Sequence, residues 1–307
     1  MRVAGWIGAI MVVLFWAGLA GAVAAAEPGY DLAITVDDLP AHSVLPKGVT
    51  RLEVAQAVIA ALEAHQAPQV YGFVNGLRLE EDPSTISVLK AWRAAGFRLG
   101  NHSYSHMDIV GHSVADYQQD LERNEPLLRQ LMGDEDWRYW RSPFLRAGET
   151  PDKHAAVAAM LKAHGYRLAE VTMGFDDWAY GEAYARCADK GDAAQIAALE
   201  TNYLDRAVLG IARSREASHR LFGRDAPQVL LLHIGAFERA VLPRLLDRLQ
   251  HSGAHFVTLP QAEADPAYGL DPDHAGEGQV FDRLAGERGL ALSVTLPSLA
   301  FLDGVCR

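Results

Sequence analysis

The chain has 307 residues, half of them hydrophobic, and a formal net charge of −11 at pH 7. This composition supplies enough apolar side chains for one large α/β domain or two small domains. The acidic surface argues against nucleic acid and against anionic membranes as binding partners.

Residues 1–26 have the pattern of an export signal. Arg2 is the only charged residue before an apolar run over residues 3–19, and the small residues at 24–26 fit a cleavage site. An uncleaved membrane anchor is the alternative, because the apolar run approaches the length of a membrane-spanning helix. In either case we expect the folded part to be exported, to the periplasm or the medium, with membrane contact only if the segment stays uncleaved.

Short apolar runs then alternate with amphipathic stretches along the chain. The predicted strands are residues 31–36, 69–74, 97–101, 138–142, 166–173, 228–234 and 255–259, and the predicted helices are residues 50–64, 83–95, 113–132, 151–164, 194–222 and 238–252. Several of the apolar runs are unbroken enough for strands that are buried on both faces. This alternation predicts a parallel sheet, either closed as a (β/α) barrel or open and doubly wound.

Beyond the last predicted strand the chain changes character. Residues 263–280 are rich in proline and glycine, which is typical of a loop, and a short helix and an apolar tail follow. We predict one domain over residues 27–262 and an extension over residues 263–307 that packs on it. Cys187 and Cys306 are the two cysteines, and in an oxidising compartment a disulfide and two free thiols are equally compatible with their spacing.

Chemically useful side chains follow five of the seven predicted strands. In parallel α/β folds the carboxyl ends of the strands meet at one edge and carry the functional groups. The residues concerned are Asp37 and Asp38 after the first strand, His102 after the third, Arg141 and Phe144 after the fourth, Asp176, Asp177 and Trp178 after the fifth, and His233 at the end of the sixth. Taken singly, each also fits a structural role, such as a core histidine or a turn aspartate. The set as a whole predicts a site.

The strongest candidates for metal ligands are His102 and His106. Because they are four residues apart, both imidazoles project from one face of a helical turn and can converge on one ion. A catalytic zinc normally takes three protein ligands, and a carboxylate commonly completes a pair of histidines. Asp37 and Asp38 can supply one ligand and one base acting on water. Solvated helix histidines are the alternative interpretation of the pair taken alone.

Five segments in order resemble the motifs of the NodB-homology polysaccharide deacetylases, carbohydrate esterase family 4. They are Thr35-Val36-Asp37-Asp38, His102-Ser103-Tyr104-Ser105-His106, Arg141-Ser142-Pro143-Phe144, Asp177-Trp178 and Leu231-Leu232-His233. The second and third of these motifs are the specific ones. The resemblance implies a NodB-like distorted (β/α) barrel of about seven units, here with a short C-terminal appendage.

The resemblance also implies an activity and a set of roles. The expected enzyme is a metal-dependent hydrolase of carbon–nitrogen bonds other than peptide bonds, which removes N-acetyl groups from an amino-sugar oligo- or polysaccharide of the chitooligosaccharide or peptidoglycan type. The implied metal ligands are Asp38, His102 and His106, the base is Asp37 held by Arg141, the acid is His233 tuned by Asp177, and the substrate contacts are Phe144, Trp178 and Leu231. Zinc is the expected ion, with cobalt or nickel as alternatives. Hydrolysis of another amide or of an acetyl ester, such as acetylated xylan, and a non-catalytic carbohydrate-binding barrel remain alternatives.

The chain also departs from the family pattern. Val36 replaces the usual aromatic residue, Leu39-Pro40 stands where the family usually has glycine, and Gly174 stands where the family has an aspartate. These departures leave open the usual polymer-binding groove and the choice between Asp176 and Asp177 as the functional acid. Residues 179–227 are too long for one crossover helix, and this stretch is a candidate cap that would restrict the substrate to short or soluble molecules.

Overall fold

The computed structural model describes residues 29–269 and 278–307, so the predicted export signal lies outside the described residues. The strands are β1 (Tyr30–Leu39), β2 (Tyr71–Val74), β3 (Arg98–Asn101), β4 (Tyr139–Trp140), β5 (Arg167–Leu168), β6 (Met173–Gly174), β7 (Gln228–His233) and β8 (Ala254–Val257). The α-helices are α1 (Arg51–Ala64), α2 (Leu77–Glu81), α3 (Ile86–Ala94), α4 (Val114–Met132), α5 (Pro151–Ala163), α6 (Gly181–Lys190), α7 (Ala193–Phe222), α8 (Ala236–His251), α9 (Leu259–Glu263) and α10 (Val280–Glu287). Within the two described ranges, none of the helices combines the length and the apolar character that crossing a bilayer requires.

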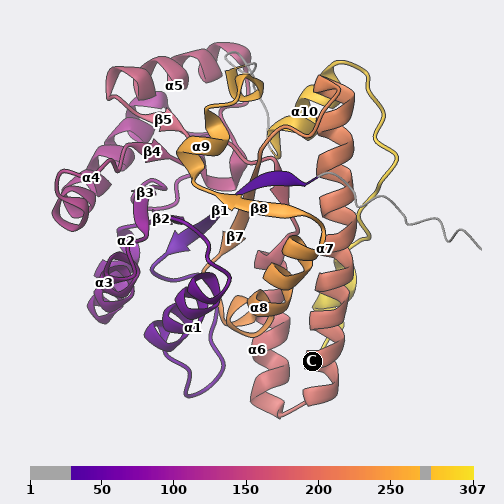
Figure 1. Cartoon of the computed structure of the whole chain (residues 1–307). Coiled ribbons are helices and arrows are strands. Elements are labelled where there is room, and N and C mark those ends of the chain that lie inside the picture. Colours follow the sequence, from indigo (N-terminus) through magenta and orange to yellow (C-terminus); the bar gives the residue numbers. More distant parts are fainter. Residues whose placement is uncertain (1–28, 270–277) are drawn as a thin grey trace, which may run out of the picture.

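The strands form one curled sheet in which every described pairing is parallel. The strand order is β5-β4-β3-β2-β1-β7-β6, and β8 pairs with the first half of β1, which runs through the centre of the fold (Figure 1). The predicted strand 166–173 is two short strands, because this stretch begins beside β4 and ends beside β7. One segment thus links the two edges of the sheet. The prediction of a distorted (β/α) barrel is confirmed.

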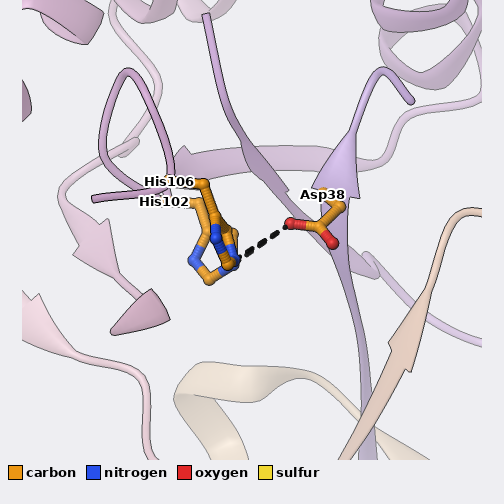
Figure 2. A group of neighbouring side chains, drawn as sticks. All are labelled: Asp38, His102 and His106. Carbon is orange, nitrogen blue, oxygen red and sulfur yellow. Dashed lines mark ion pairs between the residues drawn. The ribbon is translucent and has the colours of Figure 1, made fainter. Parts of the chain in front are cut away.

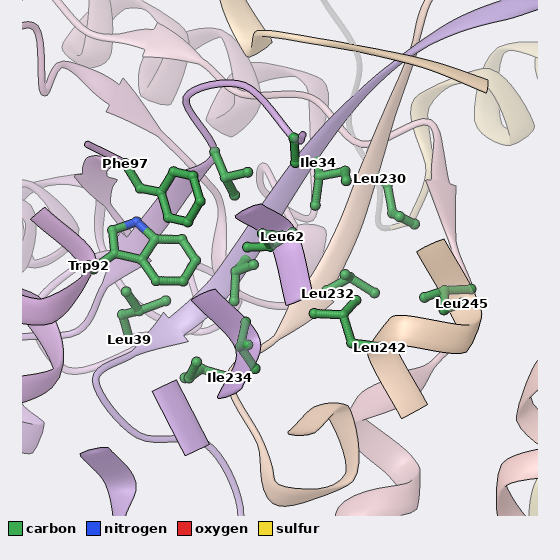
Figure 3. Packing of buried hydrophobic residues seen from close by; sticks show 14 of the residues in the cluster. Ile34, Leu39, Leu62, Trp92, Phe97, Leu230, Leu232, Ile234, Leu242 and Leu245 are labelled. Carbon is green, nitrogen blue, oxygen red and sulfur yellow. The ribbon is translucent and has the colours of Figure 1, made fainter. Parts of the chain in front are cut away.

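Helices cover the outside of the sheet (Figure 1), and the apolar side chains between the two layers are buried. In the part of the core drawn in Figure 3, Leu230 and Leu232 of β7 lie beside Leu242 and Leu245 of α8. Trp92 of α3 is also fully buried. Burying one aliphatic side chain such as Leu230 contributes about 1.5–3 kcal/mol to the stability of the fold. This packing fixes the carboxyl ends of the strands, where the predicted site residues lie.

Helices α6 and α7 form a pair at one side of the barrel (Figure 1), and α6 was not predicted. Cys187 of α6 forms a disulfide with Cys306, with the two Cα atoms 5.2 Å apart. The neighbouring Arg186 donates hydrogen bonds to the carbonyl oxygens of Leu302 and Val305. The two cysteines are therefore bridged rather than free, and they fasten the C-terminal tail to this helical pair.

Candidate active site

Asp37 and Asp38 lie at the end of β1, the central strand of the sheet. Asp37 is in register with His233 of β7. The register between β1 and β2 shifts between Val36 and Leu39, and Asp38 has a left-handed φ of 63°. In a regular strand neighbouring side chains point to opposite faces. Here the local irregularity turns both carboxylates into one pocket.

His102 and His106 face Asp38 in this pocket (Figure 2). Their Nε2 atoms lie 3.5 and 3.4 Å from Asp38 Oδ1. The prediction of a helical turn here is wrong, because the segment is a loop in which Ser103 and His106 have positive φ angles of 60° and 57°. One nitrogen from each ring and one oxygen of Asp38 all lie within 4.8 Å of one another, so the three side chains can hold a single metal ion.

The protonation states of these three side chains suit a divalent cation. Burial and the nearby His102 lower the pKa of His106 to about 4, so this ring is neutral at pH 7. His102 Nδ1 donates a hydrogen bond of 2.8 Å to the carbonyl oxygen of Arg141, which leaves the Nε2 lone pair directed at Asp38. Burial alone would raise the pKa of Asp38, but the hydrogen bond from His42 and the neighbouring histidines hold it well below its usual range. Neutral imidazoles and an ionised carboxylate are the forms that bind metal ions.

Buried asparagine side chains hold the histidine loop in place. Asn75 Nδ2 donates to the carbonyl oxygens of His102 at 2.7 Å and Ser103 at 3.1 Å. Asn124 donates to the side chain of Asn101, which also accepts the backbone N–H of Ser103. These supporting residues were not predicted from the sequence. Asn75 directly follows β2, so the strand-end rule applied to that strand would have identified it.

Arg141 is almost completely buried, with 1% of its surface exposed, directly after β4. Its Nη1 lies 3.1 and 3.3 Å from the two carboxylate oxygens of Asp37. Nη2 donates to Thr35 Oγ1 at 3.0 Å, and Nε donates to the carbonyl oxygen of Ala169 at 2.7 Å. These partners fix the guanidinium, which in turn holds the Asp37 carboxylate in one orientation.

Asp177 and His233 form an ion pair on the opposite side of the pocket. Asp177 Oδ1 lies 3.0 Å from His233 Nδ1, and Oδ2 accepts the backbone N–H of His233 at 2.6 Å. Burial lowers the pKa of His233, but Asp177, together with Asp38 and Asp37, more than offsets this and raises it to about 9. Asp176 instead pairs with Arg206 of α7. Of the two adjacent acids, Asp177 is therefore the one that contacts His233.

His42 is a further residue of the site that the sequence analysis missed. Its Nδ1 lies 2.7 Å from Asp38 Oδ2, and its ring centroid lies 5.0 Å from that of His233. The side chain therefore lies between the two acid–histidine groups and fixes the carboxylate oxygen of Asp38 that faces away from His102. In the sequence, only the position of His42 four residues after Asp38 could have indicated that it belongs to the site.

These groups line a cavity of about 740 Å³. Phe144, Trp178 and Leu231 also line it, and about half of the surface of Phe144 and of Trp178 is exposed. The Phe144 ring lies against that of His106, with centroids 4.6 Å apart, on a backbone turn with a positive φ of 57°. The predicted substrate contacts thus surround the predicted metal ligands.

The C-terminal extension, and not residues 179–227, forms one wall of the cavity. The described residues of 179–227 contribute nothing to the lining, so the prediction that this stretch caps the site is wrong. Helices α6 and α7 pack instead against α8 on the outside of the barrel, where Tyr203 contacts Phe237. Residues of the extension line the cavity in their place: Gly278, Gln279, Asp282 and Arg283.

Residues 25–169 match the family model described as polysaccharide deacetylase. The chain carries a polysaccharide deacetylase domain of the NodB-homology type. No curated protein matches it in sequence. The family match covers Asp37, Asp38, the histidine loop and Arg141, and it ends before Asp177 and His233.

Solved structures of carbohydrate esterase family 4 (CE4) share the fold of this polysaccharide deacetylase domain at low sequence identity. A CE4 family pseudoenzyme from Bacillus anthracis, as a mutant with restored enzymatic activity, is 16% identical with a TM-score of 0.53, over 76% of this chain and 67% of that chain. The Xyl-CE4 domain of a multidomain xylanase from the hindgut metagenome of Trinervitermes trinervoides is 17% identical with a TM-score of 0.51, over 80% and 95%. The peptidoglycan deacetylase PdaC from Bacillus subtilis is 17% identical with a TM-score of 0.51, over 79% and 94%. The chain spans about two thirds of the pseudoenzyme's length, and identities this low show the fold alone.

Proposed function

We propose that the protein is a metal-dependent deacetylase that removes N-acetyl groups from an amino-sugar oligo- or polysaccharide of the chitooligosaccharide or peptidoglycan type. One observation carries the proposal: a three-ligand cluster lies in a single cavity with an arginine-held carboxylate and a histidine whose pKa is raised. The ligand cluster and the carboxylate can together activate water for attack on an amide. The histidine can protonate the amine, which leaves badly unless it is protonated. The match of residues 25–169 to the polysaccharide deacetylase family supports a polysaccharide substrate.

The donor set of Asp38, His102 and His106 fits a zinc-like ion. Two imidazole nitrogens and one carboxylate form a common protein ligand set for a catalytic zinc, with cobalt or nickel as substitutes. When bound, such an ion supplies Lewis acidity toward a carbonyl oxygen and lowers the pKa of a coordinated water. The hydrogen bond from His102 Nδ1 to the carbonyl oxygen of Arg141 orients that ring, and Asn75 holds the backbone of the loop that carries it.

Asp37 is the group that would take a proton from water during the attack. It is 2% exposed and hydrogen-bonded to Arg141, which restricts its rotation. Asp37 Oδ2 lies 3.7 Å from His102 Nε2, beside the position of the ligand atoms. A base held at that distance can act on a water that lies within the ligand cluster.

His233 is the group that would donate a proton to the leaving amine. With a pKa of about 9 it is protonated at neutral pH, and Asp177 holds its Nδ1, so Nε2 is the atom free to donate. Phe144, Trp178 and Leu231 would receive the acetyl group and the adjoining sugar. We further propose that residues 27–262 form the deacetylase domain, that residues 263–307 add one wall of its cavity, and that the protein acts outside the cytoplasm.

The test is acetate release by the purified protein. Chitooligosaccharides, peptidoglycan fragments and acetylated xylan are supplied in parallel, to protein treated with a chelator and to protein reloaded with Zn²⁺, Co²⁺ or Ni²⁺. We expect release from one of the two N-acetylated substrates, loss of release on chelation, and recovery on reloading. Release from xylan alone would indicate an ester hydrolase, and release from none would favour a carbohydrate-binding barrel. Full activity in metal-free protein would contradict the mechanism.

A further inference from the structure

His42 lines the cavity, but the mechanism described above gives its ring no role. The side chain is 20% exposed, and its Nδ1 lies 2.7 Å from Asp38 Oδ2. Within the described part of the chain, Nε2 of the same ring is buried and has no hydrogen-bond partner. A buried polar atom without a partner costs free energy, so fold stability alone is a poor explanation of a histidine at this position. The contact with Asp38 is the interaction that needs an explanation.

The backbone of His42 is fixed from two sides. Its N–H donates a hydrogen bond of 3.2 Å to the carbonyl oxygen of Ile234, which directly follows β7. Its own carbonyl oxygen accepts a hydrogen bond of 2.6 Å from Arg51 Nη1 of α1, and Nη2 of the same arginine donates to the carbonyl oxygen of Ser43. The imidazole is therefore held at one place beside the Asp38 carboxylate.

The two carboxylate oxygens of Asp38 have different surroundings. Oδ1 lies 3.5 and 3.4 Å from the Nε2 atoms of His102 and His106, whereas Oδ2 faces His42 Nδ1. Because an ionised carboxylate only accepts hydrogen bonds, Nδ1 of His42 carries the proton in this contact. A protonated nitrogen has no lone pair for a metal ion. Consistent with this, the three-ligand cluster among the described residues consists of Asp38, His102 and His106, without His42.

We propose that His42 is a positioning residue that occupies Oδ2 of Asp38 and so leaves Oδ1 as the single oxygen of this carboxylate for the metal ion. Carboxylates bind cations through one or both oxygens, so this contact sets the number of ligand atoms. A hydrogen bond to the second oxygen also restricts rotation of the ligand. The inference rests on the ligand set of the proposed function, but it concerns metal binding rather than turnover.

Two substitutions separate the donor from the shape of the side chain. His42→Asn places an N–H donor close to the position of Nδ1, whereas His42→Leu has nearly the same shape as asparagine and offers no donor. Both remove the ring that lies 5.0 Å from that of His233, so the difference between them reports the hydrogen bond. Competition with a chromophoric chelator measures the affinity for Zn²⁺ without any substrate. We expect the Asn variant to bind Zn²⁺ within about threefold of the wild type and the Leu variant to bind it about 10- to 100-fold more weakly.

The visible spectrum of the Co²⁺-loaded protein gives a signature that a packing defect would not produce. Co²⁺ absorbs more strongly in a tetrahedral site with four ligands than in a site with more ligands. Once Oδ2 is released, Asp38 can bind through both oxygens, so the Leu variant should absorb more weakly for each bound Co²⁺. The spectrum of the Asn variant should match that of the wild type. The proposal would be overturned if the Leu variant matched the wild type in affinity and spectrum, or if the Asn and Leu variants were equally impaired.

Nitrogen-15 NMR of the labelled wild type tests the contact even if the Leu variant does not fold. The ring signals of His42, identified by their loss in the Asn variant, should show a proton on Nδ1 both without metal and with Zn²⁺ bound. Loss of that proton on binding Zn²⁺ would mean that His42 is itself a ligand and would overturn the proposal, as would a wild type that binds no Zn²⁺. Zn²⁺ binding with the expected spectra but without acetate release would support this proposal and contradict the proposed function.

Discussion

The two sides of the cavity are held in different ways. On one side, which we term the ligand side, Asp37, Asp38, His102 and His106 come from strand ends and one loop, and Arg141 and buried amides fix them. On the other side, the acid side, His233 depends on Asp177. The two sides share no ligand atom. Metal binding and proton delivery should therefore be separable by mutation.

The largest effect is expected on the ligand side, at the two adjacent acids. Asp38→Ala removes a ligand oxygen, so metal should be lost and kcat/KM should fall by about 10³-fold or more, with partial recovery at high metal concentration. Asp37→Asn keeps the shape and the contact with Arg141 but removes the base, so this variant should retain metal and lose about 10²–10⁴-fold in kcat whatever metal is supplied.

Stoichiometric metal analysis of both variants, beside their kcat values, checks this pair. If Asp37→Asn loses the metal while Asp38→Ala keeps it, the assignment of ligand and base is reversed. If both variants keep it, the proposed ligand set is wrong. The contrast depends on Asp38 alone having the left-handed backbone angle that turns it toward His102 and His106.

On the acid side, His233→Ala should lower kcat on N-acetyl substrates by about 10²–10⁴-fold with metal content intact. An amine requires a proton to leave, whereas the leaving group of an activated ester does not. Hydrolysis of such an ester should therefore suffer much less. Equal losses on the two substrates would mean that His233 serves the metal or the fold rather than the leaving group.

The sequence predicted the ligand side better than the acid side, for a physical reason. Asp37, Asp38 and Arg141 follow strands whose apolar runs are visible in the sequence, and parallel strands bring their carboxyl ends together. The parallel pairing and most of the long helices between the strands follow from the same alternation, whereas the strand order and α6 were not predicted. The local backbone geometry could not be predicted from the sequence. The loop of His102 and His106 and the register shift at Asp38 depend on contacts with distant elements.

The acid side could be predicted only in part. His233 ends a clear apolar strand, but the choice between Asp176 and Asp177 depends on Arg206, which lies thirty residues further along and turns Asp176 away.

A smaller effect, on the pH profile, follows from the Asp177 contact. His233 is protonated below its pKa of about 9 and loses its proton above it, so acid function is present at low pH and lost as pH rises. Asp177→Asn removes the largest of the charges that raise this pKa, leaving burial to lower it against the smaller effects of Asp38 and Asp37. The descending limb of kcat/KM should move to lower pH, and activity at pH 8 should fall roughly tenfold or more. Asp176→Asn is the matched control, since Asp176 pairs with Arg206, and its profile should match the wild type. A shift in the control of the same size would remove Asp177 from its proposed role.

The smallest effect on turnover is expected from the disulfide between Cys187 and Cys306, which joins positions 119 residues apart. Closing so long a loop restricts the unfolded chain, so the double variant Cys187→Ala/Cys306→Ala should lose about 2–4 kcal/mol of stability. At roughly 2–4 °C for each kcal/mol, calorimetry should record a Tm lower by several degrees. Turnover at 25 °C should stay within about twofold, because the described cavity lining includes neither α6 nor the tail that the bridge fastens. A fall in kcat larger than the unfolded fraction explains would instead show that the tail supports the acid side through α6, α7 and α8. The acid side would then depend on the outer helices more strongly than the ligand side does.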